Sequence, residues 1–175
     1  MLQSAALERK SVPVQGKEDF VSAERIFSIC TNLVLPGWLL LVFLPRWRYS
    51  ARLISGAIIP AVLGAVYLVL VVIHLPGSSG GFGSLAQVAE LFRNEFALLA
   101  GWIHYLAFDL FIGSWEVRDS ERLGIPHLAV VPCLVLTFLL GPIGLLMYLG
   151  LRMVWKRKLY VDESVSLKNV AAFRQ

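Results

Sequence analysis

The chain alternates between long apolar stretches and shorter polar ones over most of its length. Four of the apolar stretches are long enough to cross the hydrocarbon core of a bilayer as a helix, which takes about 20 residues. They cover about residues 26–45, 53–75, 94–115 and 127–153. The pattern predicts an all-α integral membrane protein, a helical bundle with about four transmembrane helices.

The polar stretches divide the rest of the chain. We expect a polar N-terminal tail over residues 1–24, a membrane domain over 25–154 and a basic-to-mixed C-terminal tail over 155–175. Residues 77–84, rich in glycine and serine, predict a flexible connection. The pattern of residues 85–93 predicts a short amphipathic helix at the surface. The N-terminal tail has neither the apolar core of a signal peptide nor the acid-poor composition of a transit peptide.

Composition supports the membrane interpretation. Of the 175 residues, 57% are hydrophobic and 16% are charged, and a soluble domain carries about 25% charged residues. This length leaves no room for a second, soluble enzyme domain. The net charge of +4 lies in loops and tails, where basic residues set topology, so we predict no nucleic-acid partner. The two cysteines form no CxxC pattern.

The basic residues also predict an orientation. Four spans place both termini on one side, and the Lys and Arg residues near the span ends favour the cytoplasm for that side. Arg46, Arg48 and Arg52, in the predicted first loop, favour the opposite orientation.

The third apolar stretch carries three polar residues in its interior: His104, Tyr105 and Asp109. An ionisable residue inside a membrane segment is costly, and it marks a candidate functional site. On a helical wheel Tyr105 and Asp109 share one face with Asn94 and Glu116. His104 lies about 140° away from Asp109 around the helix, so another helix would have to supply its partner.

Several interpretations of these residues stay open at this point. In the structural one, His104 and Asp109 fix the register of neighbouring helices by hydrogen bonds. In the catalytic one, Asp109 acts as general acid and then as base within the low-dielectric bilayer. In the third, Asp109, Glu116 and His104 relay protons or ions. His127 opens the fourth span, where helix-end hydrogen bonding and chemistry are both open.

A metal site has little support. His104, Asp109, Asp119 and His127 would have to converge from two helices and a loop, and no HxxxH or HExxH spacing is present. We therefore predict neither a metal nor a cofactor.

Residues 101–149 resemble the neoxanthin-synthase-like family, the family of the plant protein named for abscisic acid deficiency four. The third and fourth apolar stretches carry the specific matches and the first contributes one more: Gly101-Trp102-x-His104-Tyr105-Leu106-Ala107-Phe108-Asp109-Leu110, Pro126-His127, Pro132-Cys133-Leu134, Thr137, Gly141-Pro142-x-Gly144 and Asn32-Leu33-x-Leu35-Pro36-x-Trp38. The resemblance covers roughly residues 26–153 and leaves out the tails.

The resemblance implies a membrane protein associated with the conversion of violaxanthin to neoxanthin. This step opens an epoxide to an allenic alcohol, an isomerisation without a redox cofactor. It needs an acid at the epoxide oxygen and a base for a carbon-bound proton. The chemistry of the step, and not the motif, makes Asp109, His104 and Tyr105 the first candidates for proton transfer. Asp119 and His127 are the next candidates.

We therefore expect a membrane isomerase acting on a carotenoid or similar hydrophobic polyene, with the bilayer and an isoprenoid as its partners. The alternative is a non-catalytic scaffold or pigment-binding accessory protein, and a weaker alternative is a small transporter or proton-relay protein. Plant members of the family carry a plastid transit peptide, which the N-terminal tail does not resemble. The expected location is thus the plasma membrane of a bacterium. The oligomeric state stays open.

Overall fold

The computed structural model describes residues 22–47 and 49–156. Within these ranges the chain is all-helical, as predicted. The elements in chain order are α1 (Ala23–Phe43), the π-helix η1 (Ser50–Ile58), α2 (Ile59–His74), α3 (Leu85–Leu91), α4 (Glu95–Leu123), α5 (His127–Leu140) and α6 (Pro142–Lys156). The expected surface helix over 85–93 is present as α3. Most of both predicted tails lies outside the described residues.

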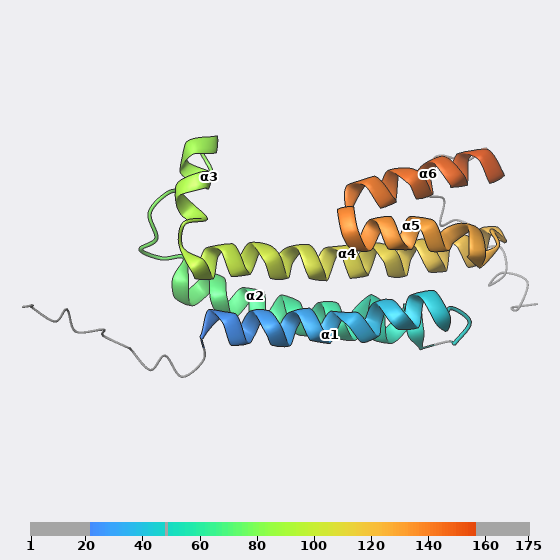
Figure 1. Ribbon diagram of the computed structural model, residues 1–175, viewed down its shortest axis with the longest axis horizontal. Coiled ribbons are helices and arrows are strands. Elements are labelled where there is room, and N and C mark those ends of the chain that lie inside the picture. The colour runs from blue at the N-terminus through green and yellow to red at the C-terminus, as the bar shows by residue number, and fades with distance from the viewer. Residues whose placement is uncertain (1–21, 48, 157–175) are drawn as a thin grey trace, which may run out of the picture.

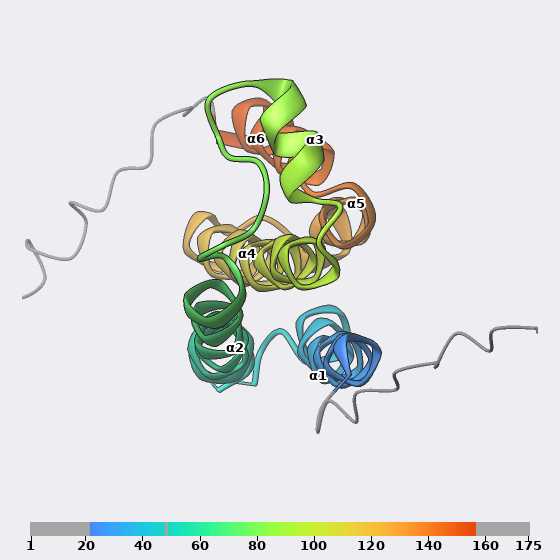
Figure 2. The same ribbon diagram turned by 90° about the vertical axis from the view of Figure 1, so that its left-hand side faces the viewer.

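Helix α4 is the centre of the bundle. It packs against α1, η1 and α2 on one side and against α5 and α6 on the other (Figures 1 and 2). Its first turn is capped by Asn94, whose side-chain oxygen accepts hydrogen bonds from the backbone N–H groups of Phe96 and Ala97. It ends at Gly124, which adopts the left-handed conformation typical of a helix C-terminus. The helices α1, η1, α2, α5 and α6 therefore all pack on α4.

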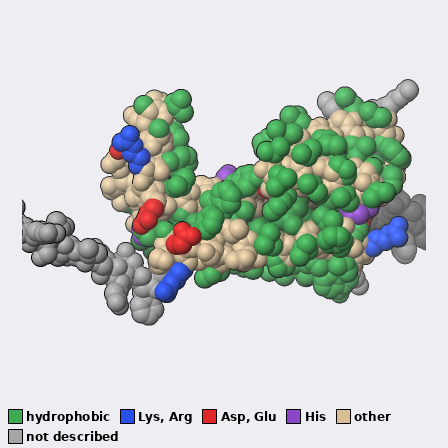
Figure 3. All heavy atoms as spheres, in the orientation of Figure 1, with side chains coloured by type: hydrophobic (Ala, Val, Ile, Leu, Met, Phe, Trp, Pro, Cys, Tyr) green, Lys and Arg blue, Asp and Glu red, His purple; other side chains and the backbone are tan. Residues whose placement is uncertain are grey.

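Three helical segments are long and apolar enough to cross a membrane: α1, the continuous segment from η1 through α2, and α4. Hydrophobic side chains cover the middle of the molecule in Figure 3, and the charged side chains on this face gather towards the ends of its long axis. This distribution is typical of a protein that spans a bilayer with its helices roughly parallel to the membrane normal.

The structure differs from the sequence prediction at the C-terminal end of α4. We expected the third span to end near residue 115 and a loop to follow, but α4 continues to Leu123. The polar residues of this last part do not break the helix because Glu116, Asp119 and Ser120 are buried within the bundle.

The expected single span over residues 127–153 is instead a hairpin of two shorter helices, α5 and α6 (Figure 1). Gly141 has φ of +49°, which ends α5, and Pro142 has no N–H group with which to continue it. The two helices pack so closely after this turn that a methyl group at Gly144 would overlap the backbone nitrogen of Thr137. Hydropathy could not reveal the turn, because both arms are apolar.

The hairpin changes the expected topology. With 14 and 15 residues, α5 and α6 are about 21 and 23 Å long, which is shorter than a hydrocarbon core of about 30 Å. The chain enters the hairpin and leaves it at the same end of the bundle. The described part therefore starts at Ser22 at one end and finishes with α6 at the other (Figure 1). The expectation of both termini on one side depended on a fourth full span and has no support from this fold.

Candidate functional site

The polar face of α4 lies against the α5–α6 hairpin, and Tyr105 and Asp109 occupy it at the hairpin turn. The hydroxyl of Tyr105 donates a hydrogen bond of 3.1 Å to the backbone carbonyl of Phe138 near the end of α5. The carboxyl group of Asp109 packs against Gly141, where a methyl group would lie 3.0 Å from Oδ1 of Asp109. The expectation that Tyr105 and Asp109 share one face is confirmed, and α5–α6 supplies the opposite wall.

Glu116 lies deeper in the same interface, two turns after Asp109 along α4. It is completely buried, and its Oε1 accepts a hydrogen bond of 2.9 Å from the hydroxyl of Thr137. Within the described residues, Oε2 of Glu116 and Oδ2 of Asp109 are buried and have no hydrogen-bond partner. A buried carboxyl oxygen without a partner is costly, so each of these two oxygens calls for an explanation such as a bound water or a catalytic role.

Asp119 forms a separate polar cluster near the open end of the hairpin. Its Oδ2 accepts a hydrogen bond of 2.8 Å from the hydroxyl of Tyr148 and lies 2.9 Å from Nε of Arg152. Its Oδ1 lies 2.7 Å from Nη2 of Arg122, one turn further along α4. All of its described contacts are thus to fixed side chains, so the cluster holds α6 against α4.

His104 lies on the opposite side of α4 and faces α2. Its ring stacks on Phe108 with 4.5 Å between centroids and lies 5.8 Å from the ring of Tyr67. The side chain is exposed on the surface that we assign to lipid. The structure agrees with the helical wheel, and α5–α6 does not bring His104 to Asp109.

His127 begins α5 and ties it to α1. Its Nε2 lies 2.9 Å from the carbonyl oxygen of Val42, the distance of a hydrogen bond in which the ring N–H donates.

The five site residues predicted from the sequence therefore lie in four separate places, and the structure brings together only Tyr105 and Asp109. Across the described ranges, no group of three or more His, Cys, Asp or Glu residues is arranged to hold a metal ion.

Sequence reasoning missed the partners that the hairpin contributes, namely Thr137, Tyr148 and Arg152. One signal for them was present. An arginine inside an apolar helix needs a buried partner, and Tyr148 and Arg152 are four residues apart on one face of α6. The sequence did not show that their partner is Asp119 on α4, because the contact depends on the hairpin folding back onto that helix.

Comparisons with known proteins identify the family of the chain. No solved structure shows a significant match to the chain. Protein ABA DEFICIENT 4, chloroplastic, of Arabidopsis thaliana is 28% identical over 106 residues, which are 56% of this chain and 48% of the relative. The chain thus spans about half the length of this curated relative. The profile of the ABA4-like family, described as ABA DEFICIENT 4-like, matches residues 25–148, which include nearly all of α1, the whole of α2, α4 and α5, and the first half of α6. The chain therefore belongs to the ABA DEFICIENT 4-like family.

Proposed function

We propose that this protein is a membrane isomerase that opens an epoxide on a carotenoid or similar hydrophobic polyene, with Asp109 as the proton-transfer group. The observation that carries the proposal is the place of Asp109. Its carboxyl group lies halfway along α4 at the hairpin turn, half-buried, and its Oδ2 has no hydrogen-bond partner within the described residues. Family membership supports the substrate class, because the matched relative is named for a deficiency in abscisic acid and the resemblance implies neoxanthin formation.

The proposed step is balanced without a co-reactant. The protonated Asp109 carboxyl gives its proton to the epoxide oxygen, and the C–O bond to the ring carbon next to the polyene breaks. The resulting positive charge spreads over the conjugated chain. A proton then leaves a polyene carbon for the Asp109 carboxylate, which leaves an allene and an alcohol. Substrate and product contain the same atoms, and Asp109 ends protonated as it began.

The other polar residues support Asp109 in this proposal. Tyr105, one turn before Asp109, is fixed by its bond to Phe138 and positions the substrate end group beside the carboxyl. Asp119 holds the hairpin through Arg152, and His127 anchors α5 to Val42. His104 faces α2 and contributes no proton to the step.

The test is expression of the full chain in a host that makes violaxanthin, followed by pigment analysis of its membranes. The parent should form an allenic product, and Asp109→Asn should reduce formation about 100-fold or more, the usual contribution of a general acid–base group. His104→Ala is the matched control, because it also removes an ionisable side chain from α4, and it should keep the parent rate. Equal product from Asp109→Asn and parent would refute the proposal.

A non-catalytic pigment-binding protein is the second candidate. Exposed aromatic side chains beside Tyr105, among them Phe92 and Trp102, favour it. It predicts that the parent and the Asp109→Asn variant carry the same pigment, chemically unchanged. The same expression experiment therefore separates the two functions.

We place the two ends of the bundle on opposite sides of the membrane. Arg46, Arg52 and Arg122 are exposed at the end where α1 and α4 finish, and Arg25 and Arg93 are exposed at the end where they begin. We propose that the first of these ends faces the cytoplasm, because it exposes more basic residues and such residues favour that side. The plasma membrane of a bacterium stays our prediction for the location.

A further inference from the structure

About half of one α4 face is left uncovered by the hairpin. The hairpin turn at Gly141 meets α4 at Asp109, near the middle of the helix. Towards the N-terminal end of α4, the next element on this side is α3, which stands away from the hairpin in Figure 1. On the stretch of α4 between α3 and the hairpin turn, Leu98 and Trp102 are 56% and 38% exposed, so this stretch is open to the side of the molecule.

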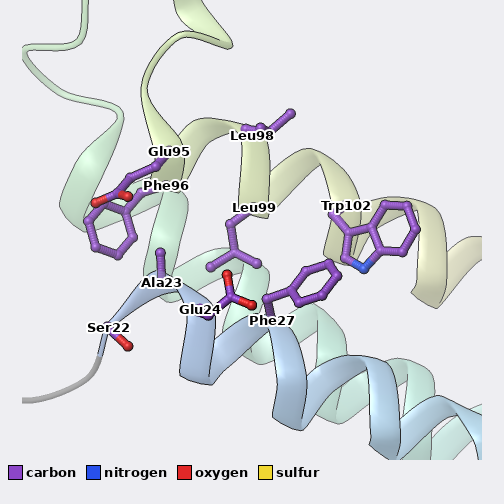
Figure 4. A pocket seen from close by; sticks show the side chains of 9 residues that line it. All are labelled: Ser22, Ala23, Glu24, Phe27, Glu95, Phe96, Leu98, Leu99 and Trp102. Atoms are coloured by element: carbon purple, nitrogen blue, oxygen red, sulfur yellow. The ribbon is translucent and has the colours of Figure 1, made fainter.

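Two cavities lie along this stretch. One, of about 350 Å³, is lined by Phe92, Gly101 and Tyr105. The other, of about 500 Å³, lies between the first turns of α1 and α4 (Figure 4). Leu98 and Trp102 line both cavities, so the two adjoin at these side chains, and we call the pair the α4 groove. Each cavity lies in the usual volume range of small-molecule sites, about 300–1,000 Å³.

The wall of the α4 groove is aromatic and fixed in place. The ring of Trp102 lies 5.6 Å from the ring of Phe27 and 5.5 Å from that of Tyr105. The indole N–H of Trp102 donates a hydrogen bond of 3.1 Å to the hydroxyl of Thr31 on α1. Such a row of rings, locked before binding, suits a flat conjugated molecule because little ordering of side chains is needed.

Polar groups lie at both ends of the groove. Glu24 and Glu95 line its outer end, where α1 and α4 begin (Figure 4). Tyr105 lines its inner end, and Asp109 follows one helical turn beyond. Glu95 and Asp109 are 14 residues apart on α4, which is about 21 Å along the helix. The groove thus offers hydrogen-bonding groups at two ends of an apolar path.

We infer that the α4 groove binds a rod-shaped polyene with a hydrogen-bonding group at each end, and that it delivers the inner end to Asp109. Oxygens of Glu24 and Glu95 accept a hydrogen bond from a hydroxyl at the outer end. The conjugated chain lies on the rings of Phe27 and Trp102. This inference rests on the proposed function, because it defines the shape of the substrate of that site.

The test is to fill the groove with one side chain. In Gly101→Leu the new side chain enters the cavity beside Phe92, because even a methyl group at this position would lie 3.3 Å from that ring. Gly150→Leu on α6 is the matched control, because nothing lies within 4 Å of a methyl group there. The full-length variants are purified in detergent from the violaxanthin-producing host, and violaxanthin plus its product is measured per chain. A second set is loaded with β-carotene, which lacks the end hydroxyls.

Gly101→Leu should retain pigment about tenfold less tightly than the parent, the lower end of what one misfitting group costs in an apolar pocket. Gly150→Leu should retain as much pigment as the parent, and β-carotene should bind more weakly than violaxanthin. A Gly101→Leu variant that still holds pigment overturns the groove, while product formation by the parent keeps the proposed function. If Gly101→Leu loses pigment and neither the parent nor any variant forms product, the proposed function is wrong and the inference about the groove stands. A parent that retains only phospholipid overturns the inference.

Discussion

Asp119 on α4 and Arg152 on α6 form an ion pair in the interior of the bundle. Nε of Arg152 lies 2.9 Å from Oδ2 of Asp119, and the two side chains are 1% and 2% exposed, respectively. The hydroxyl of Tyr148 donates to the same carboxylate oxygen. This cluster joins the last helix to the central one beyond Glu116, and it fixes how the hairpin lies on α4.

Removing one charge of this pair should destabilise the protein strongly. Arg152→Met removes the buried partner of the Asp119 carboxylate and leaves it with the partly exposed Arg122, which costs about 3–5 kcal/mol of unfolding free energy. The double variant Asp119→Asn/Arg152→Met should regain part of that loss, since it leaves neither charge of the buried pair without the other. Unfolding in detergent, followed by circular dichroism, measures both.

The exposed pair of Arg93 and Glu90 serves as the control for this measurement. Its side chains are 78% and 43% exposed, so Arg93→Met should change stability by less than about 1 kcal/mol. If Arg152→Met were as mild as Arg93→Met, the buried pair would not hold the hairpin.

The close crossing of α5 and α6 should depend on Gly144. In Gly144→Ala the new methyl group overlaps the backbone of Thr137, and separating the helices costs about 1–3 kcal/mol or more. Gly150→Ala, where the methyl group meets open space, should be neutral or slightly stabilising, because alanine favours helix. Hydrogen exchange of α5 and α6 compares the variants, and equal protection in both would contradict the tight hairpin.

The two ends of the described chain should react with reagents on opposite sides of the membrane. Single cysteines at Ser22 and Val154, in a chain with Cys30 and Cys133 replaced by alanine, report on the two ends. A membrane-impermeant maleimide added to intact cells should label Ser22→Cys, and Val154→Cys should react only after the cells are opened. Labelling of both in intact cells, or of neither, would support a full fourth span.

His127 should contribute to stability and leave the chemistry unchanged. His127→Ala loses the bond to the carbonyl oxygen of Val42, which contributes about 0.5–1.5 kcal/mol. Product formation per folded chain should equal that of the parent. Leu128→Ala, at a neighbouring position that is 83% exposed, controls for side-chain removal at the start of α5. A large loss of activity with unchanged stability would instead show that His127 takes part in the chemistry.

The order of apolar and polar positions determined the membrane class, the all-helical fold and the first three spans, because the thickness of the bilayer sets the length of a crossing helix. The same pattern singled out Asp109 and Tyr105, since a 3.6-residue period alone decides which side chains share a face of α4. It also separated His104 from them.

The tertiary structure decided what covers that face. Hydropathy is the same whether residues 127–153 form one helix or two, so only the backbone turn at Gly141 and the contact of Gly144 with Thr137 reveal the hairpin. The hairpin brings Thr137 to Glu116 and Arg152 to Asp119, contacts between residues far apart in the chain that no local period encodes. Because it is only half as long as α4, the hairpin also leaves the α4 groove open beside Tyr105, one turn before Asp109.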